Sequence, residues 1–187
     1  AIGGWDTSKV TGMVATFYNA EAFNSELVWD TSKVTGMRST FDGAEAFNQP
    51  LAWDTSSVTI MHVTFYQAQA FDQLLAWDAS KVKNMEFTFS RADAFNQPGI
   101  SAWDVSKVSA MTEMFDDSAL ASDECSKVEL RDAWQSVAAF TYDWSASVCP
   151  GVFFAKASLK AAVDGLATAE GTHGPIAGWD VSRVDDM

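Results

Sequence analysis

The sequence predicts an α/β repeat solenoid, built from coils of about 24 residues and followed by a small helical connector. Five tryptophans recur at spacings of 24, 24, 24 and 26 residues, each followed by a methionine eight residues later and a phenylalanine twelve residues later. The repeat then stops near residue 121, where the composition changes. The recurring positions are Trp5, Trp29, Trp53, Trp77 and Trp103; Met13, Met37, Met61, Met85 and Met111; and Phe17, Phe41, Phe65, Phe89 and Phe115.

Each coil is expected to contain a short strand and a helical or 3₁₀ return. In residues 51–55, Leu51, Trp53 and Thr55 alternate onto one side of an extended segment. In residues 58–71, apolar residues recur at intervals of three and four, which places them on one face of a helical or turn-rich stretch. The period lies within the range of about 20 to 29 residues that is typical of leucine-rich repeats. Because one coil cannot bury such a face alone, we expect the Trp, Met and Phe positions to stack between neighbouring coils as a structural ladder.

Three regions follow from this repeat. Residues 1–121 are predicted to form five coils, and the fifth carries a two-residue insertion near residues 98–101, as is typical of terminal repeats. Residues 122–175 are predicted to form a helical cap or connector. Residues 176–187 repeat the opening phrase of the chain at an offset of 174, so we expect them to begin a second repeat array. The chain is therefore expected to be one module of a longer tandem array.

The connector is expected to contain two helices and a disulfide. Ser126 is the expected N-cap of the first helix, because Glu129 follows at the capping-box position. Residues 157–169 show helical spacing and predict the second helix. Cys125 and Cys149 flank the first helix, and a disulfide between them would contribute about 3 kcal/mol by closing this loop. Two buried free thiols are the alternative for this pair.

Composition and missing motifs exclude several classes of protein. The chain has 12 basic and 25 acidic residues and a formal net charge of −13, so without a basic stripe it is not expected to bind nucleic acid. No window reaches the roughly 18 to 20 uninterrupted apolar residues of a membrane span, and no membrane insertion is expected. No Gly-rich phosphate loop, HExxH, GxSxG or CxxC motif occurs, so the chain is not expected to be an enzyme.

A carboxylate follows each repeat tryptophan, with a serine two residues further on. An aspartate at this spacing caps a turn by accepting backbone N–H bonds, so we expect a turn-capping ladder. A Ca²⁺ site along the column is a weaker alternative, because hard cations take several oxygen ligands. No other metal and no cofactor is expected. The column consists of Asp6, Asp30, Asp54, Asp78 and Asp104.

Positions that differ between coils are expected to face solvent. A solenoid that recognises a partner does so from such an extended surface, so these positions are candidates for a partner surface. His62 occupies one of them without a companion at ligand spacing, and it is expected to be exposed and inert. In the connector, Trp134, Tyr142 and Trp144 are expected to offer a further aromatic patch. The candidate partner surface in the coils consists of Tyr18, Tyr66, Arg38, Glu86 and Arg91.

The repeated phrase also resembles a known family. Trp-Asp-Thr/Val-Ser-Lys-Val-x-x-Met, followed by Phe and by the phrase at residues 46–50, Ala-Phe-Asn-Gln-Pro, is similar to the repeat of BspA-type leucine-rich-repeat surface proteins, also seen as mycoplasma-type lipoprotein repeats. The resemblance covers residues 1–121 and 176–187, and the connector resembles spacers between such arrays in large proteins of unicellular algae. It implies a secreted or cell-surface protein used for adhesion or as a scaffold, and it says little about a ligand.

The sequence therefore favours a non-enzymatic extracellular or cell-surface repeat module that acts as a structural scaffold or adhesion element in a longer tandem array. Its expected partners are proteins, above all copies of itself or neighbouring modules. One alternative is a ligand-binding domain that recognises protein or glycan through the variable solenoid face, and a weaker one is a calcium-dependent adhesion module. A scaffold predicts modules that dock through their ends, whereas a binder predicts a cleft or a patch of exposed aromatic residues.

Overall fold

A computed structural model gives the structure of the chain and describes residues 2–149. The chain divides into two compact units, Ala1–Ala146 and Ser147–Met187. The fold set out below is that of the first unit. The helix expected at residues 157–169 and the repeat restart expected at residues 176–187 lie outside the described residues, as does the last part of the expected connector.

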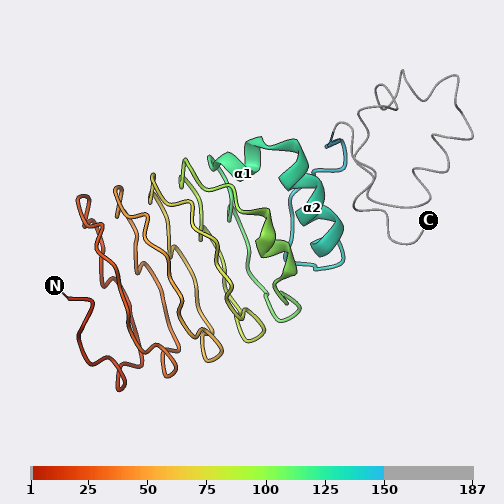
Figure 1. The fold of residues 1–187 in the computed structure, drawn as a ribbon. Helices are drawn as coiled ribbons and strands as arrows, with labels where there is room; N and C mark the ends of the chain where they lie inside the picture. The colour runs from red at the N-terminus through yellow and green to blue at the C-terminus, as the bar shows by residue number, and fades with distance from the viewer. Residues whose placement is uncertain (1, 150–187) are drawn as a thin grey trace, which may run out of the picture. The chain divides into compact units, whose positions relative to one another are not determined.

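Successive coils of the first unit lie side by side in parallel (Figure 1). Single parallel bridges join Gly12 to Gly36, Gly36 to Ile60, Ile60 to Asn84 and Asn84 to Ala110, so five coils share one register. The bridged positions have the same spacing as the repeat tryptophans. We number the coils 1 to 5 by the tryptophans at which they begin, which are Trp5, Trp29, Trp53, Trp77 and Trp103.

Backbone hydrogen bonds hold each coil to the next. In coil 2, Met37, Ser39, Phe41 and Gly43 donate their N–H groups to carbonyls of coil 3 at 2.8–3.1 Å. The N–H groups of Thr40, Asp42 and Ala44 instead close turns within the coil, as Ala44 does with the carbonyl of Phe41 at 3.0 Å. The backbone donors of Met37 and of residues 39–44 are thereby satisfied without a helix or a continuous strand.

The conformation within the coils differs from the expected strand and helical return. Among the described residues, residues 51–55 contain no strand, and residues 58–71 form turns with one bridge and no helix. Each coil places two residues four positions apart in the left-handed region, for example Val63 with φ of 60° and Gln67 with φ of 56°. A turn of type II requires positive φ at its third residue, and such a residue interrupts a right-handed helix. The repeated turns also restrict parallel pairing to single bridges.

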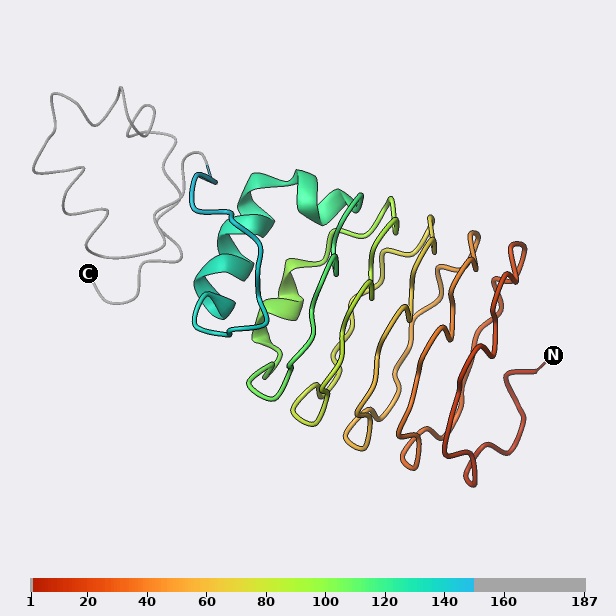
Figure 2. The same cartoon turned by 180° about the vertical axis from the view of Figure 1, so that it is seen from behind.

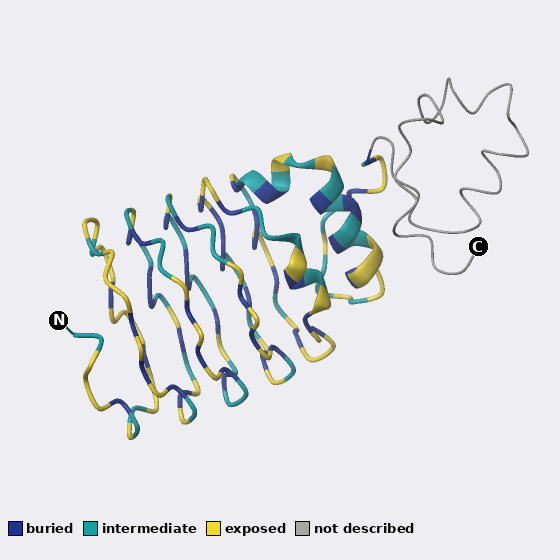
Figure 3. Cartoon of the chain, in the orientation of Figure 1, coloured by how far each residue is buried: buried dark blue, intermediate teal, exposed yellow. Residues whose placement is uncertain are grey.

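Buried residues recur in every coil (Figure 3), and most of them are apolar. Trp29 and Trp53 stack with ring centroids 6.2 Å apart and an interplanar angle of 3°. Phe41 and Phe65 stack at 5.3 Å in the same way. All fifteen recurring Trp, Met and Phe positions are buried except Trp5, which is 62% exposed on the outer face of coil 1. Full burial of a large aliphatic or aromatic side chain is worth about 1.5 to 3 kcal/mol, so this column is the main source of stability.

A buried threonine column runs beside the methionines. The hydroxyl of Thr64 donates to the carbonyl of Met61 at 2.7 Å and also approaches the carbonyl of Met37, in the preceding coil, at 3.0 Å. Thr40 and Thr88 make the same pair of contacts in their coils. Thr40, Thr64 and Thr88 recur every 24 residues, three residues after each repeat methionine. They satisfy polar backbone groups inside the apolar interior.

Helices cover the end of the stack at coil 5 (Figures 1 and 2). The insertion forms η1, a 3₁₀ helix at Pro98–Ala102, and the coil is followed by α1 (Ala119–Ser122) and α2 (Glu124–Trp134). The N-cap of α2 is Asp123, whose carboxylate accepts the N–H of Ser126 at 2.7 Å, and the expected cap at Ser126 is wrong. The Ser126 hydroxyl donates instead to Asn96 at 2.8 Å, which joins α2 to coil 4.

The cap has its own aromatic core. The Phe115 ring of coil 5 packs against the rings of Trp134, Tyr142 and Trp144 at 5.9–6.2 Å. Trp134 and Trp144 are buried, so the aromatic patch expected here is part of the core and not a partner surface. The indole of Trp134 donates to the carbonyl of Ser101 at 3.2 Å, which fixes α2 on η1.

Cys125 and Cys149 are both disulfide-bonded. They are the two cysteines of the chain, so the predicted disulfide is present. None of the helices within residues 2–149 has the length and apolar character needed to cross a bilayer.

Candidate functional site

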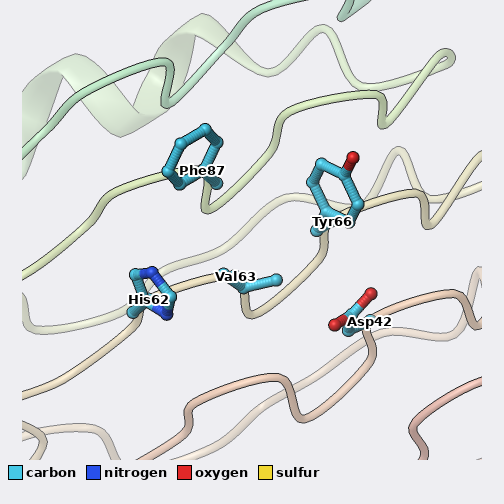
Figure 4. A pocket seen from close by; sticks show the side chains of 5 residues that line it. All are labelled: Asp42, His62, Val63, Tyr66 and Phe87. Atoms are coloured by element: carbon cyan, nitrogen blue, oxygen red, sulfur yellow. The ribbon is translucent and has the colours of Figure 1, made fainter.

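A shallow groove lies on the turn surface of coils 2 to 4 (Figure 4). It has a volume of about 270 Å³ and is lined by Asp42, His62, Val63, Tyr66 and Phe87. The rings of His62, Tyr66 and Phe87 surround Val63, and the Asp42 carboxylate lies at the rim. His62 packs edge-on against Phe87 with ring centroids 6.2 Å apart. His62 is therefore a half-buried wall of the groove, and the expectation that it is exposed is wrong.

Two of the predicted partner-surface residues meet at this groove. The Arg91 guanidinium lies over the Tyr66 ring, with Cζ 5.9 Å from the ring centroid. Tyr18 and Arg38 are exposed but do not line the groove. Glu86 is half-buried and accepts the side-chain amide of Asn84 at 2.7 Å, so it is engaged within its own coil.

Positive backbone φ angles place the apolar wall of the groove. Val63 and Phe87 have φ of 60° and 55°, whereas Ala15 and Ser39 hold the equivalent positions of coils 1 and 2. Positive φ is rare for a β-branched or bulky side chain, and such strain amounts to about 1 to 3 kcal/mol per residue. The sequence signal was the column two residues after each repeat methionine, where Val63 and Phe87 are large apolar residues and Ala15, Ser39 and Glu113 stand in the other coils. Sequence reasoning missed this column.

The Asp42 carboxylate is partly removed from water. Burial raises the pKa of Asp42, while a hydrogen bond from Ser39 and the charge of the nearby His62 act in the opposite direction. A raised pKa means that the ionised carboxylate is incompletely compensated by its surroundings. A positive charge placed in the groove would compensate it.

The aspartate column forms turns along another edge of the coils. The Asp30 carboxylate accepts the N–H of Ser32 at 3.0 Å and its hydroxyl at 2.7 Å. Hydrogen bonds from the serine side chain and backbone lower the pKa of every aspartate in the column. Within residues 2–149, no group of three or more His, Cys, Asp or Glu residues is placed to hold a metal ion. The backbone bond recurs at Asp6, Asp54, Asp78 and Asp104.

A second hollow of about 210 Å³ lies on the cap. Its polar groups are engaged with one another, since Arg131 donates to the carbonyl of Trp144 at 3.3 Å and pairs with Asp132 at 2.9 Å. It is therefore a weaker candidate site than the groove. The lining residues are Arg131, Gln135, Phe140, Tyr142, Asp143, Trp144 and Ser145.

One family model matches the chain. Its description is "Mycoplasma protein of unknown function, DUF285", and it matches residues 1–76 and, a second time, residues 51–146. The two matches begin 50 residues apart, close to two coil periods, so each follows the internal repeat. The matches agree with the mycoplasma-type repeat that the sequence resembles. No curated protein and no solved structure matches the chain.

Proposed function

The chain belongs to the family described as Mycoplasma protein of unknown function, DUF285, and on this basis we propose that it is a non-enzymatic scaffold module. In this proposal its coils are a leucine-rich-repeat-like solenoid, and the outer face of coil 1 docks a coil of a neighbouring module. The chain is then one element of a longer array on the outside of a cell. The observation that carries the proposal is the exposure of Trp5 on the outer face of coil 1, because the equivalent tryptophans between coils are buried.

The coil interfaces are chemically equivalent. The indole of Trp53 donates to the carbonyl of Leu27, two residues before the tryptophan that begins the preceding coil, at 3.3 Å, and that of Trp77 donates likewise to Leu51 at 3.1 Å. The N–H of Asn48 donates to the Asn24 side chain at 3.0 Å. Because these bonds recur at a fixed offset, any coil with the same phrase fits onto the preceding one.

The outer face of coil 1 carries the same groups without a coil upon it in the described residues. In coil 2 the carbonyls of Gly36, Arg38 and Thr40 accept N–H groups of coil 1 at 2.8–2.9 Å, and Gly12, Val14 and Thr16 hold the equivalent positions in coil 1. Trp29 is covered by coil 1, because Trp5 stacks on its ring and its indole donates to the carbonyl of Ile2 at 3.0 Å. Trp29 is consequently 9% exposed, whereas Trp5 is 62% exposed. A row of backbone groups beside an exposed aromatic ring is a template for pairing with a further coil.

The opposite end of the stack is closed by α2 and the aromatic cap, so growth by further coils is directed to coil 1. The disulfide supports an extracellular site of action, because disulfides persist in oxidising environments. A stack of coils that contact only their neighbours resists bending and provides a constant spacing. These are the properties of a scaffold.

Sedimentation velocity of the purified chain tests this proposal. The chain is expected to associate as its concentration rises, and Trp5→Asp should abolish the association because it places a charge on the docking face. The control is Tyr18→Asp, which introduces the same charge at an aromatic residue that is 56% exposed on the turn surface. A chain that stays monomeric at all concentrations, or that associates equally well with Trp5→Asp, would contradict the proposal.

A further inference from the structure

We propose that the groove lined by Asp42, His62, Val63, Tyr66 and Phe87 binds the cationic side chain of a lysine or arginine presented by a partner protein. This function is separate from docking at coil 1. It would make the turn surface of coils 2 to 4 a recognition site for a basic segment, and its chemistry follows from four properties of the groove.

The first property is the arrangement of aromatic rings and a carboxylate. Tyr66 and Phe87 belong to successive coils and, with His62, form the walls around Val63 (Figure 4). A cation within about 6 Å of an aromatic ring centroid is attracted by the negative face of the ring. Asp42 at the rim adds a full opposite charge. A volume of about 270 Å³ fits one side chain and excludes a helix or a strand.

The second property is charge. The chain has a net charge of −13, which attracts a basic partner over a distance and raises its rate of encounter. Asp42 is the carboxylate that lines the groove, and burial raises its pKa because the ionised form is poorly hydrated. A bound ammonium or guanidinium group would stabilise the negative charge of the Asp42 carboxylate in place of the water that burial excludes.

The third property is an internal example of the same interaction. Arg91 already lies over the Tyr66 ring at 5.9 Å, so this ring accepts a guanidinium group. Arg91 is exposed, and its contact with Asp117 is 3.8 Å long between two solvated side chains. A pair of this kind contributes little to stability, so it leaves the Tyr66 side chain accessible to a second cation.

The fourth property is the strain at Val63 and Phe87. Both residues hold positive φ angles that small or polar residues hold in coils 1 and 2, at Ala15 and Ser39. Both are half-buried and add little to the core of the stack. Every coil holds a residue in this conformation, so the groove differs from the other coils in the bulky side chains that Val63 and Phe87 present there, and an occupant of the groove would bury these two side chains.

A saccharide fits these observations less well than a basic side chain. Among the lining residues, the side chains that can donate a hydrogen bond are His62 and Tyr66. A saccharide needs several donors and acceptors around its hydroxyl groups, whereas the groove is mostly apolar with one carboxylate. A cationic side chain can be bound by the aromatic rings and the Asp42 carboxylate alone.

Nuclear magnetic resonance titration of the full chain tests the proposal directly. The probes are N-acetyl-lysine methylamide and N-acetyl-arginine methylamide, with N-acetyl-norleucine methylamide as the uncharged match. Ring signals of His62 and Tyr66 are expected to shift saturably with both cationic probes, with millimolar affinity, and not with norleucine. Lactose is titrated in parallel, and saturable shifts with lactose alone would overturn the choice of ligand.

Variants separate a specific site from general charge attraction. Asp42→Asn is expected to weaken binding by at least about fivefold, because it removes the charge at the rim. Phe87→Ser, which installs the residue found at position 39, should weaken it similarly. Glu45→Gln removes the same charge from an exposed position on coil 2 outside the groove and should leave binding unchanged. No saturable shift with either cationic probe, or an equal effect of Glu45→Gln and Asp42→Asn, would overturn the proposal.

Discussion

The hydroxyl of Tyr142 accepts the backbone N–H of Phe115 at 2.8 Å. In the preceding coils the equivalent N–H donates to a carbonyl of the next coil, as Phe41 does to Thr64 and Phe89 does to Met114, both at 2.8 Å. The same hydroxyl donates to the carboxylate of Asp116 at 2.7 Å. The cap therefore closes the stack by offering coil 5 the acceptor that a sixth coil would have supplied.

Replacing Tyr142 by Phe should lower the free energy of unfolding by about 1 to 3 kcal/mol, because the N–H of Phe115 loses its acceptor in a largely buried place. Urea denaturation followed by tryptophan fluorescence measures this change. The matched control is Tyr18→Phe at an exposed position, where a change within about 0.5 kcal/mol is expected. Equal effects of the two variants would show that the hydroxyl of Tyr142 is not needed to end the stack.

Stability should also depend on pH through Tyr142. Burial, followed by the hydrogen bond to Asp116, raises the pKa of Tyr142 above its ordinary value of 10.0. A phenol whose pKa is raised by folding stabilises the fold below the unfolded pKa of about 10, and this contribution is lost as pH rises above it. Unfolding of the wild type and of Tyr142→Phe should therefore converge in free energy above about pH 10. Curves that stay parallel across this range would contradict the assignment.

The serine hydrogen bonds of the aspartate column should make stability depend on pH in the opposite direction, with the loss at low pH. Hydrogen bonds from the side chain and backbone of Ser32 lower the pKa of Asp30 below 3.8, so their stabilising effect is present above that pH and is lost as pH falls below it. Ser32→Ala should raise the pKa of Asp30 and leave that of Asp104 unchanged. Carboxyl ¹³C titration resolves both groups. Unchanged titration of Asp30 would mean that Ser32 does not hold the turn.

The repeat spacing predicts which side chains share a column, but not how the chain runs between them. A spacing of 24 residues between Trp29 and Trp53 follows directly from the sequence, and the two rings lie 6.2 Å apart. The turns could not be read in the same way, because Val63 and Phe87 hold positive φ without a glycine or asparagine to signal it. Apolar spacing of three and four residues is shared by a helix and by this series of turns, so the period alone did not decide between the helical and the turn-rich alternative for residues 58–71.

The candidate site was predictable only in part for a related reason. Variable positions indicated Tyr66 and Arg91, because a side chain that changes between coils is not required by the stack. The groove also needs His62 and Asp42, which come from different coils and meet through the left-handed turns. Likewise, the bond from Phe115 to Tyr142 crosses 27 residues and depends on where the chain returns after α2. Such contacts depend on tertiary structure and leave no local pattern.

The buried threonine column offers a separate test of the coil interior. Thr64→Val keeps the shape of the side chain but removes the donor that serves the carbonyls of Met61 and Met37, so a loss of about 1 to 3 kcal/mol is expected. The control is Thr59→Val, whose hydroxyl bonds the carbonyl of Thr35 at the surface, and for which we expect little change. Chemical denaturation measures both. A Thr59 variant as unstable as the Thr64 variant would show that the effect does not come from the interior.

The position of an aromatic residue along the stack should decide how much its side chain contributes to the free energy of unfolding. Phe65 is fully buried between Phe41 and Phe89, so Phe65→Ala should cost about 3 to 5 kcal/mol through lost burial and the cavity left behind. Within residues 2–149, Trp5 stacks on the ring of Trp29 alone and is mostly exposed, so Trp5→Ala should cost much less in the dilute monomer. Thermal unfolding at low protein concentration compares them. Equal losses would contradict the description of coil 1 as an open end.

The most direct test of the scaffold proposal is imaging of the source protein in its native assembly by electron cryomicroscopy. The account predicts particles several times larger than the 20.3 kDa of this chain, in which a further coil covers coil 1 and buries Trp5. Discrete particles of the mass of this chain alone, with Trp5 in contact with solvent, would contradict it.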